Sequence, residues 1–412
     1  MSENLTTFDD VLTYLDGKGL FHVDLTLDRM SQALQELNLE HLSFPVVQVL
    51  GTNGKGSTST FLANICQKHH LRTGLYTSPH FVSPTERIKI DGQNVQASAW
   101  LKPAQKIKAV APNLTYFEFL TIAALLFFQD NVDVAILEAG LGGAHDATTA
   151  IPADLICYTP IALDHCQVLG QTLAEIASDK AKAIRSKAPV VTASQYPQAY
   201  QVLAKAAQEQ GASLEIAKPL ATTTGLRLRG KHQAINGGLA KLAFEKLAKL
   251  CKITPQDDLI DLGLKTAFLP GRLQDVPASL DYPKMLLDGG HNPHGLQTVL
   301  ETLRNESPPS ALIYAGLDDK DWPSALRLLA QEYHGKIPAY FPILHNPRAS
   351  QAAKMHELWY KHLDAKKDFV PQTVGQILRQ LASNQESYVL VIGSLYLLAE
   401  VYTEFPNLLL PD

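Results

Sequence analysis

Short apolar runs alternate with helix-like segments along most of the chain. Val46–Leu50 and Val132–Glu138 are such runs, and the first precedes a segment with apolar residues at Phe61, Leu62 and Ile65. These patterns are typical of buried parallel strands joined by helices and predict an α/β fold. Further predicted strands begin at Thr73 or span Pro84–Ile90, Asp154–Thr159, Ala188–Thr192 and Leu214–Lys218. Predicted helices lie within residues 8–40, from Leu114 to near Gln129, from Thr172 to Arg185 and from Gln233 onward.

A second alternation of strands and helices follows residue 284. Its predicted elements span Met285–Asp288, Ala311–Gly316, Pro323–Tyr333, a strand near Tyr340, Ala352–Leu363 and Tyr388–Gly393. A chain of 412 residues is too long for one ordinary core. We therefore expect a larger N-terminal domain over residues 1–276, a linker over 277–284 and a smaller C-terminal α/β (Rossmann-like) domain over 285–412.

The first predicted strand is joined to its helix by the glycine-rich segment Gly51-Thr52-Asn53-Gly54-Lys55-Gly56-Ser57. Glycines let backbone N–H groups turn inward, and a helix N-terminus adds partial positive charge. Lys55 supplies a full charge for the outer phosphates, and Ser57 or Thr58 can contact a phosphate oxygen or a metal ion. The spacing differs from the common GxxxxGK[ST] loop because Gly56 separates Lys55 from Ser57. The segment predicts an unusual phosphate-binding loop.

Polar side chains follow several predicted strands where those strands end. Ser78 and His80 lie in the exit loop of the second strand, Glu138 ends a later strand, and Asp164-His165 follows another. Loops at the carboxyl ends of parallel strands carry the ligand contacts in open α/β sheets, and a carboxylate there often holds a metal ion beside phosphates. His165 alone is compatible with a core histidine, but with Glu138 nearby it favours a metal or phosphate role.

The composition is that of an ordinary globular protein, with 46% hydrophobic and 19% charged residues. The net charge of −5 argues against general binding to nucleic acid or membrane surfaces. The longest apolar run, Phe119–Phe128, is about half a membrane span. The polar N-terminus is unlike a signal peptide, and the four cysteines include no CxxC pair. We therefore expect a soluble, cytoplasmic protein with reduced, mostly buried thiols.

Several motifs occur together in one order. They are GTNGKGS, TSPH at Thr77–His80, LEAGLGG with DAT in Leu137–Thr148, ALDH before Leu169-Gly170, HQAIN at His232–Asn236, PGR at Pro270–Arg272, DGGHNPHG at Asp288–Gly295 and GSLYL at Gly393–Leu397. In these motifs, over nearly the whole chain, the sequence resembles the folylpolyglutamate synthase family of the Mur ligase superfamily. Two further segments, His22–Arg29 and Leu114–Phe119, are most similar to the bacterial bifunctional dihydrofolate synthase/folylpolyglutamate synthases.

The resemblance implies a P-loop ATPase domain of the Mur ligase type and an ATP-dependent, amide-forming ligase. Enzymes of the family activate a folate carboxylate with the γ-phosphate of ATP, and the amino group of L-glutamate attacks the acyl phosphate. The implied reactions join L-glutamate to dihydropteroate, forming dihydrofolate, and to reduced folates, forming polyglutamates, in folate biosynthesis and one-carbon metabolism. Two Mg²⁺ ions are expected to neutralise the reacting charges. Nothing in the sequence requires an oligomer, and a monomer is expected.

The resemblance also assigns residues. ATP contacts are expected at Thr52, Asn53, Gly54, Lys55, Gly56, Ser57, Asn236, Arg272 and Asp288. Metal ligands are expected at Ser78, Glu138 and His165. The positions that match the dihydropteroate pocket are Asp24, Leu25, Thr26, Leu27, Thr115, Tyr116, Phe117, Glu118, His145, Asp146 and Ala147, with Tyr116 and Phe117 as a candidate pterin platform. The expected catalytic residues are Lys55, Glu138, His165 and Lys180. Candidates for the glutamate site are His291 and Arg348.

Lys180 matches a lysine that is carbamylated in many Mur ligases, and a carbamate would turn this cation into an anionic metal ligand. The chain departs from the family pattern elsewhere. Ala144 stands in place of arginine, Thr149 of asparagine, Lys182 of the glycine in an EKAGI motif and Gly290 of alanine. The phosphate and metal positions are intact, so ATP turnover is still expected.

Several alternatives stay open. A monofunctional dihydrofolate or folylpolyglutamate synthase would carry the same motifs, and Ala144 and Lys182 keep a non-catalytic ATP-binding paralogue in consideration. A cell-wall ligase of the Mur type is disfavoured because only fifty residues precede Gly51, which leaves no space for an additional UDP-binding domain.

Overall fold

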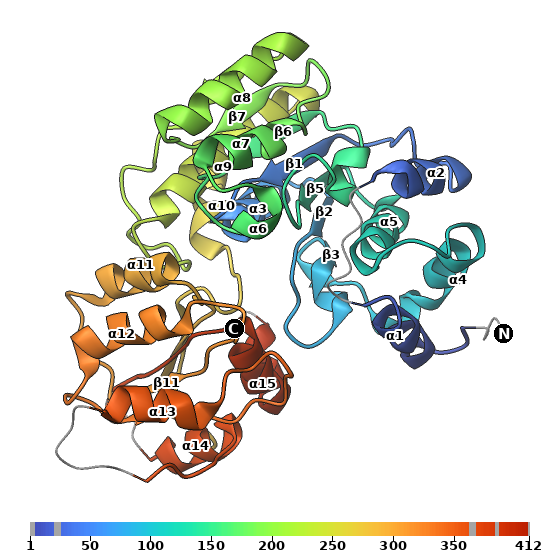
Figure 1. Cartoon of the computed structure of the whole chain (residues 1–412). Coiled ribbons are helices and arrows are strands. Elements are labelled where there is room, and N and C mark those ends of the chain that lie inside the picture. The colour runs from blue at the N-terminus through green and yellow to red at the C-terminus, as the bar shows by residue number, and fades with distance from the viewer. Residues whose placement is uncertain (1–4, 20–25, 362–367, 384–386, 411–412) are drawn as a thin grey trace. The chain divides into compact units, whose positions relative to one another are not determined.

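The computed structural model describes residues 5–19, 26–361, 368–383 and 387–410, which form two compact units (Figure 1). The first unit contains the chain up to Leu226 together with Gln233–Ala267, and the second contains Arg227–His232 and the chain from Phe268 onward.

This division differs from the expected limits of the domains. Strand β9 (Gln274–Val276) pairs antiparallel with β10 (Met285–Asp288), and both strands belong to the sheet of the second unit. Residues 277–284, which we expected to link two domains, therefore connect two neighbouring strands of one sheet. The prolines in this segment are compatible both with a linker between domains and with a loop between two strands. The sequence therefore did not distinguish these possibilities. The limits of the functional domains stay a prediction.

The first unit is built on an eight-stranded sheet in the order β4-β3-β2-β5-β1-β6-β7-β8. Its strands are β1 (Val46–Leu50), β2 (Thr73–Tyr76), β3 (Ile88–Ile90), β4 (Gln93–Asn94), β5 (Val134–Glu138), β6 (Leu155–Tyr158), β7 (Val190–Thr192) and β8 (Leu214–Ile216). The strands from β2 to β8 in this order are parallel, whereas β3 and β4 are antiparallel additions at one edge. Every residue of β1 and β5 is buried, as their continuous apolar runs predicted.

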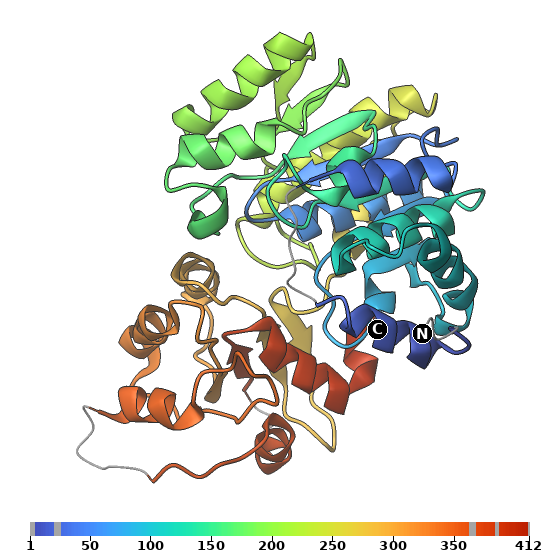
Figure 2. The ribbon, with the colours of Figure 1, turned by 45° about the vertical axis from the view of Figure 1, so that its right-hand side comes forward.

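Helices pack on both faces of this sheet (Figure 1). On one face lie α1 (Phe8–Asp16), α2 (Asp28–Glu36), α4 (Leu101–Val110) and α5 (Tyr116–Phe128), and beside them α7 (Leu173–Ala181) and α8 (Pro197–Gln210). The helices α3 (Lys55–Lys68), α9 (Gln233–Leu250) and α10 (Asp257–Thr266) pack against one another and on the other face. Figure 2 shows α7 and α8, in green, side by side as in Figure 1.

Several predicted elements are shorter than expected. Pro84–Arg87 forms a 3-10 helix, η1, and only Ile88–Ile90 of the predicted strand is extended. Ser83 caps this turn and Pro84 occupies its first position, which favours a helical start over a strand. The predicted helix Thr172–Arg185 ends at Ala181.

The second unit contains a five-stranded sheet in the order β12-β11-β13-β10-β9. Its other strands are β11 (Ala311–Tyr314), β12 (Ala339–Tyr340) and β13 (Val389–Ile392), all parallel to β10. A hydrophobic core joins the sheet to α11 (Pro293–Leu303), α12 (Trp322–Tyr333) and α13 (Ala352–Tyr360). The helices α14 (Val374–Leu381) and α15 (Leu395–Glu404) pack together, and α15 contacts β10 and β13. The predicted α/β class, with a larger and a smaller unit, is confirmed.

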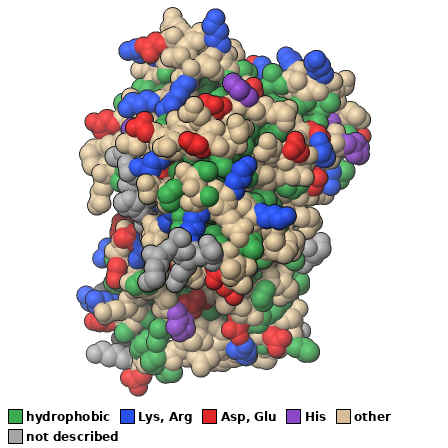
Figure 3. Space-filling view, turned by 90° about the vertical axis from the view of Figure 1, so that its right-hand side faces the viewer, with side chains coloured by type: hydrophobic (Ala, Val, Ile, Leu, Met, Phe, Trp, Pro, Cys, Tyr) green, Lys and Arg blue, Asp and Glu red, His purple; other side chains and the backbone are tan. Residues whose placement is uncertain are grey.

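Charged side chains of both signs are scattered over the face shown in Figure 3, in keeping with the small net charge. Within the described ranges, no helix is both long and apolar enough to span a membrane. All four cysteines are free; Cys66 and Cys157 are buried, whereas Cys166 and Cys251 are partly exposed.

Candidate active site

The glycine loop after β1 leaves no room for side chains at two positions. Gly51 and Gly54 have φ angles of 135° and 90°, which strongly favour glycine. A Cβ atom on Gly51 would lie 1.9 Å from Oγ1 of Thr159, and one on Gly54 would lie 2.2 Å from Oδ1 of Asn236. The loop therefore packs against the segment after β6 and against α9, which places Asn236 beside the predicted phosphate loop.

Hydrogen bonds to the segment after β6 fix this loop. The N–H groups of Thr52 and Asn53 donate to the carbonyl oxygen of Pro160 at 3.0 and 3.3 Å. The Thr52 hydroxyl accepts the N–H of Ala162 at 3.0 Å and donates to its carbonyl at 3.1 Å. The segment after β6 thus fixes the position of the loop, and the N–H groups of Thr52 and Asn53 already donate hydrogen bonds within the protein.

The amino end of α3 carries a cation and two buried hydroxyls. Nζ of Lys55 donates to the carbonyl oxygens of Gly51 and Thr52, at 3.3 Å each, so its side chain folds back over the loop. The hydroxyls of Thr58 and Ser59 are buried and have no hydrogen-bond partner in the described structure. Such groups are unfavourable unless a ligand satisfies them, and a helix N-terminus suits an anionic one. The other predicted loop contacts in this turn are Gly56 and Ser57.

The carboxyl ends of β2 and β5 bring Ser78 and Glu138 together. Glu138 is the last residue of β5 and only 4% exposed, and the N–H of Ser78 donates to its Oε2 at 3.1 Å. His165 lies after β6 with a left-handed φ of 50°, and its side chain is 47% exposed. Because β2, β5 and β6 are parallel strands of one sheet, all three residues lie at the same edge.

The donors at this edge fit a hard divalent cation. A carboxylate, a hydroxyl and an imidazole are provided by Glu138, Ser78 and His165. Among the described residues, no group of three or more His, Cys, Asp or Glu side chains could hold a metal ion. The predicted set has only two side chains of those types, and Mg²⁺ usually completes its shell with water and substrate phosphates. The donors therefore fit a magnesium ion held jointly with a nucleotide.

Lys180 is a buried lysine of α7, and its backbone lies close to Gly143 in the loop that follows β5. It is 4% exposed, and burial, followed by the positive charge of Lys55, lowers the pKa of Lys180 to about 7. The negative charges of Asp179, Asp146 and Asp164 act in the opposite direction. The sequence pattern alone gave no reason to select this lysine, since its burial depends on how α7 packs. Its amine is unusually easy to deprotonate.

The loop after β5 is organised by Asp146. Its carboxylate accepts the N–H of Leu141 at 2.9 Å and both the N–H and the hydroxyl of Thr148, at 3.0 and 2.6 Å. Burial raises the pKa of Asp146, and these hydrogen bonds act against the rise. Asp146 thus shapes the loop, while the neighbouring His145 is exposed and Ala147 is buried.

The predicted substrate residues Thr115–Glu118 form the start of α5. Thr115 is the N-cap: its hydroxyl accepts the N–H of Glu118 at 3.4 Å, and its own N–H donates to the Glu118 carboxylate at 2.7 Å. The same carboxylate pairs with Arg29 of α2 at 3.0 Å. Glu118 is thus engaged by protein groups, a structural role that the sequence did not indicate.

The two aromatic residues in this turn lie beside the strand ends. A Cβ atom on Gly140 would lie 2.8 Å from Cζ of Phe117, so that ring covers the loop after β5. Tyr116 is 4% exposed, and its ring centroid lies 6.4 Å from that of His80, in the loop after β2. The structure therefore brings both rings to the edge that carries Ser78 and Glu138.

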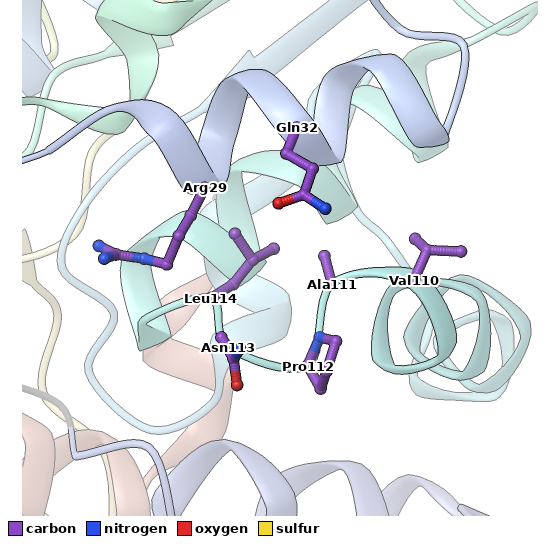
Figure 4. Close-up of a pocket in the computed structure, with 7 residues that line it drawn as sticks. All are labelled: Arg29, Gln32, Val110, Ala111, Pro112, Asn113 and Leu114. Atoms are coloured by element: carbon purple, nitrogen blue, oxygen red, sulfur yellow. The ribbon is translucent and has the colours of Figure 1, made fainter.

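A small hollow lies next to this turn (Figure 4). It has a volume of about 90 Å³ and is lined by Arg29, Gln32, Val110, Ala111, Pro112, Asn113 and Leu114. Arg29 thus faces both the hollow and Glu118. Two of the predicted residues on this side are described, Thr26 and Leu27 before α2; Asp24 and Leu25 lie outside the described residues.

Arg87 was expected only as part of a strand, but the structure places it beside the site residues His80 and Tyr116. Its side chain is 5% exposed; Nε donates to Nδ1 of His80 at 2.8 Å, and the guanidinium lies 5.6 Å from the ring centroid of Tyr116. Burial and the charge of Arg87 lower the pKa of His80 to about 3. The sequence contained one indication of this contact. Arg87 follows His80 by seven residues and directly precedes β3, which runs antiparallel to β2.

The departures from the family pattern are accommodated locally. The carbonyl oxygen of Ala144 accepts Nη2 of Arg185 at 3.1 Å, and the hydroxyl of Thr149 accepts the side-chain amide of Gln48 at 2.9 Å. Lys182 is exposed and lines an open groove between α7 and α8. None of these contacts blocks the strand-end site.

The second unit carries the remaining predicted residues. The buried carboxylate of Asp288 accepts the N–H groups of Leu273 and Gly290 at 2.9 and 2.7 Å, and burial raises its pKa while the charge of Arg272 acts against the rise. The glutamate candidates lie apart in sequence: Nδ1 of His291 is 3.1 Å from the Gly289 carbonyl oxygen, whereas Arg348 forms an ion pair with Asp319.

Known proteins resemble the chain over nearly its full length. No family model matches it. The dihydrofolate synthase/folylpolyglutamate synthase of Bacillus subtilis is 30% identical over 438 residues, covering 96% of this chain and 98% of the relative. The structure of Escherichia coli FolC in complex with DHPP and ADP has a TM-score of 0.82 and 29% identity, covering 98% of this chain and 99% of that one. A bifunctional enzyme of Yersinia pestis complexed with AMPPNP and Mn ion has a TM-score of 0.81 and 29% identity, with 98% and 100% covered.

The fold and its strand-end loops define a ligase of the Mur type. The chain belongs to the dihydrofolate synthase/folylpolyglutamate synthase family. The predicted family, fold and class of ATP-dependent ligase are thereby confirmed.

Proposed function

We propose that the protein joins L-glutamate to dihydropteroate, forming dihydrofolate, and to reduced folates, forming polyglutamates, with ATP as co-substrate. The observation that carries this proposal is the full-length similarity to bifunctional relatives, on a chain whose glycine loop adjoins the paired Ser78 and Glu138. The protein would act as a cytoplasmic monomer that binds no nucleic acid or membrane.

ATP is proposed to bind at the glycine loop. The absence of Cβ atoms at Gly51 and Gly54, together with the unpaired hydroxyls of Thr58 and Ser59, supports a phosphate site there. Lys55 would release the loop carbonyls and neutralise the outer phosphates. The remaining proposed contacts are Thr52, Asn53, Gly54, Gly56, Ser57 and Asn236 in the first unit and Arg272 and Asp288 in the second.

Magnesium is proposed to be held by Ser78, Glu138 and His165, with two ions in total. When bound, it would neutralise phosphate charge and the charge that develops during transfer. The Mn ion and AMPPNP bound to the Yersinia pestis relative support a divalent ion at a nucleotide site. The N–H of Ser78 fixes one oxygen of Glu138, which would orient the carboxylate for the ion.

The proposed reaction has two steps, formation of an acyl phosphate and formation of the amide. A carboxylate oxygen of the folate or pteroate attacks the γ-phosphorus, the bond from that phosphorus to ADP breaks, and an acyl phosphate forms. The amine of L-glutamate then attacks the acyl carbon, loses a proton, and phosphate leaves with its bonding electrons. Water must be excluded from the site during this reaction, because it would otherwise hydrolyse the acyl phosphate.

The pteridine substrate is proposed to bind at three segments of the chain, Asp24–Leu27, Thr115–Glu118 and His145–Ala147. DHPP in the E. coli relative supports a pocket for this class of molecule. Tyr116 and Phe117 would contact the ring system, whereas Glu118 and Asp146 would hold the loops through the bonds described above.

Lys180 is proposed to be carbamylated. The amine that reacts with CO₂ is the uncharged one, and a pKa of about 7 makes this form abundant near neutral pH. The nitrogen attacks the carbon of CO₂ and loses a proton, which leaves a carbamate anion. This anion would remove the repulsion between Lys180 and Lys55 and add a negative group near the proposed metal site.

One assay tests the proposal and separates its alternatives. Purified protein is incubated with Mg-ATP, L-glutamate and either 7,8-dihydropteroate or a reduced folate, and phosphate release and product mass are followed. Glutamate-dependent products from both substrates are expected. Product from one substrate alone would identify a monofunctional enzyme. If no phosphate is released with either substrate, the protein is a non-catalytic ATP-binding protein.

A further inference from the structure

Arg87 links the end of β2 to the start of α5. It is the last residue of η1, and its carbonyl oxygen accepts the N–H of Thr77 at 2.9 Å. Thr77 directly precedes Ser78, whose N–H contacts Glu138. On its other side, the guanidinium lies over the ring of Tyr116. Arg87 therefore lies between the proposed metal site and the proposed platform for the pteridine.

The guanidinium of Arg87 is buried. Within the described ranges, no carboxylate lies within ion-pair distance of Arg87, and its contacts there are the His80 imidazole and the Tyr116 ring. Arginines this deeply buried are normally paired with an anion, because removing the charge from water is costly. A guanidinium has five N–H donors, and His80 accepts only one of them. The remaining donors lack an acceptor among the described residues.

The bond to His80 adds a further donor. Since Nε of Arg87 always donates, Nδ1 of His80 must accept, and the imidazole carries its proton on Nε2. The pair thus presents N–H groups and no acceptor of its own at this place. The planar fork of a guanidinium matches the two oxygen atoms of a carboxylate.

We propose that Arg87 and His80 form a carboxylate-binding subsite for the pteroate or folate substrate, and that it binds the carboxylate to be activated. This inference rests on the proposed function. L-Glutamate also carries carboxylates, but the position of Arg87, between Tyr116 and the Ser78–Glu138 contact, favours the acyl substrate. Dihydropteroate has a single carboxylate, which makes it the cleaner probe.

The test compares dihydropteroate with an analogue in which hydrogen replaces the carboxylate. Binding of each is measured by calorimetry with Mg²⁺ and a non-hydrolysable ATP analogue, for the wild type, Arg87→Gln and Arg87→Lys. Arg87→Gln is expected to weaken binding of the acid by about 10- to 100-fold, the range for hydrogen bonds to charged groups, and to leave the analogue unchanged. Arg87→Lys keeps the positive charge but loses the planar pair of N–H donors, so its affinity for dihydropteroate is expected to lie between those of the wild type and Arg87→Gln.

Steady-state kinetics distinguish the source of the carboxylate. In Arg87→Lys the KM for dihydropteroate is expected to rise while the KM for L-glutamate stays unchanged; the reverse would overturn the assignment. The matched control is Arg72→Gln, which removes an exposed arginine before β2, paired with Asp133, and is expected to change neither KM. Unchanged affinity for the ATP analogue shows that the variants are folded.

Two results would contradict the subsite. Equal losses for the acid and the analogue would mean that Arg87 only packs the loop, and unchanged binding of both would mean that it does not reach the substrate. If the wild type itself forms no product from either folate substrate, the proposed function fails together with the subsite. If the wild type forms product and either contradicting result is obtained, only the subsite fails.

Discussion

The backbone N–H of Ser78 donates a hydrogen bond to Oε2 of Glu138 at 3.1 Å, joining the ends of β2 and β5. This contact leaves the carboxylate oriented toward the edge where the glycine loop also ends. Glu138 is buried at the carboxyl end of a parallel strand, where a carboxylate commonly binds a metal ion beside phosphates. The arrangement explains why Glu138 is a better candidate for a metal ligand than a glutamate on a helix surface.

Glu138→Gln is expected to leave the fold intact and to lower turnover by about 100-fold or more. The amide oxygen can still accept the Ser78 N–H, but the negative charge that holds the metal is lost. Turnover is measured by phosphate release at saturating Mg²⁺, and folding by circular dichroism. Glu209→Gln is the control, because that carboxylate is exposed and, among the described residues, pairs at the surface with Lys205. Activity near the wild-type level would show that Glu138 binds no metal.

The glycine loop gives a second prediction. Gly54→Ala would place Cβ 2.2 Å from Oδ1 of Asn236 at a φ of 90°, so either the loop or Asn236 must move. Since displacements of this size disturb a positioned site strongly, affinity for an ATP analogue is expected to fall by about tenfold or more in calorimetry.

Gly335→Ala is the matched control for this substitution. Gly335 also has a positive φ, 74°, but a Cβ atom there would meet nothing within 4 Å. It is expected to lower the unfolding free energy by about 1 kcal/mol through backbone strain alone, with ATP affinity unchanged. Equal ATP affinities for the two variants would contradict a close-fitting phosphate loop.

The sequence predicted the frame of this site better than its internal contacts. The strands β1, β5 and β10 were located because each is a buried run of apolar residues, and the carboxyl-end rule then brought Ser78 and Glu138 to one edge. Strand β9 was missed, since Gln274–Val276 is short, partly polar and followed by proline.

Contacts between side chains on different elements could not be predicted. The Arg87–His80 bond depends on the 3-10 turn η1, which Ser83 and Pro84 form in place of a strand. The pairing of Glu118 with Arg29 depends on how α2 packs on α5. No periodicity in the chain reports such packing, so Glu118 was interpreted as a substrate residue only from the resemblance.

The pKa of Lys180 predicts a pH dependence of stability. Burial lowers this pKa to about 7, whereas an unfolded lysine titrates near 10.4, about three units higher. Between about pH 7 and 10 the unfolded chain holds a proton that the folded chain lacks, so this group makes stability rise with pH, by up to about 1.4 kcal/mol per unit. In buffers free of CO₂, the unfolding free energy of the wild type relative to Lys180→Met is expected to increase from pH 7 to 9. A flat difference would mean that the amine is not buried in solution.

The carbamate is tested separately. With ¹³C-labelled bicarbonate, the wild type is expected to show a carbamate carbon signal in NMR, stronger at pH 8 than at pH 6 because more of the amine is uncharged. Lys180→Ala is expected to lose this signal and most of its turnover, and added acetate should restore part of the turnover by supplying an anion in the vacated space. Full activity in Lys180→Ala would remove Lys180 from the catalytic set.

The last prediction concerns the pair of Arg29 and Glu118. The side chains of Arg29 and Glu118 are 23% and 6% exposed. Arg29→Ala removes the ion-pair partner of the nearly buried Glu118 carboxylate, which keeps its hydrogen bond from the Thr115 N–H. Breaking such a pair is expected to lower the unfolding free energy by roughly 2–4 kcal/mol, measured by urea denaturation. Arg72→Ala breaks a pair of similar length, 2.7 Å, whose side chains are 54% and 38% exposed, and is expected to cost less than about 1 kcal/mol. If both variants lose the same stability, the Arg29 pair does not hold α2 on α5, and the hollow beside it would owe its shape to apolar packing alone.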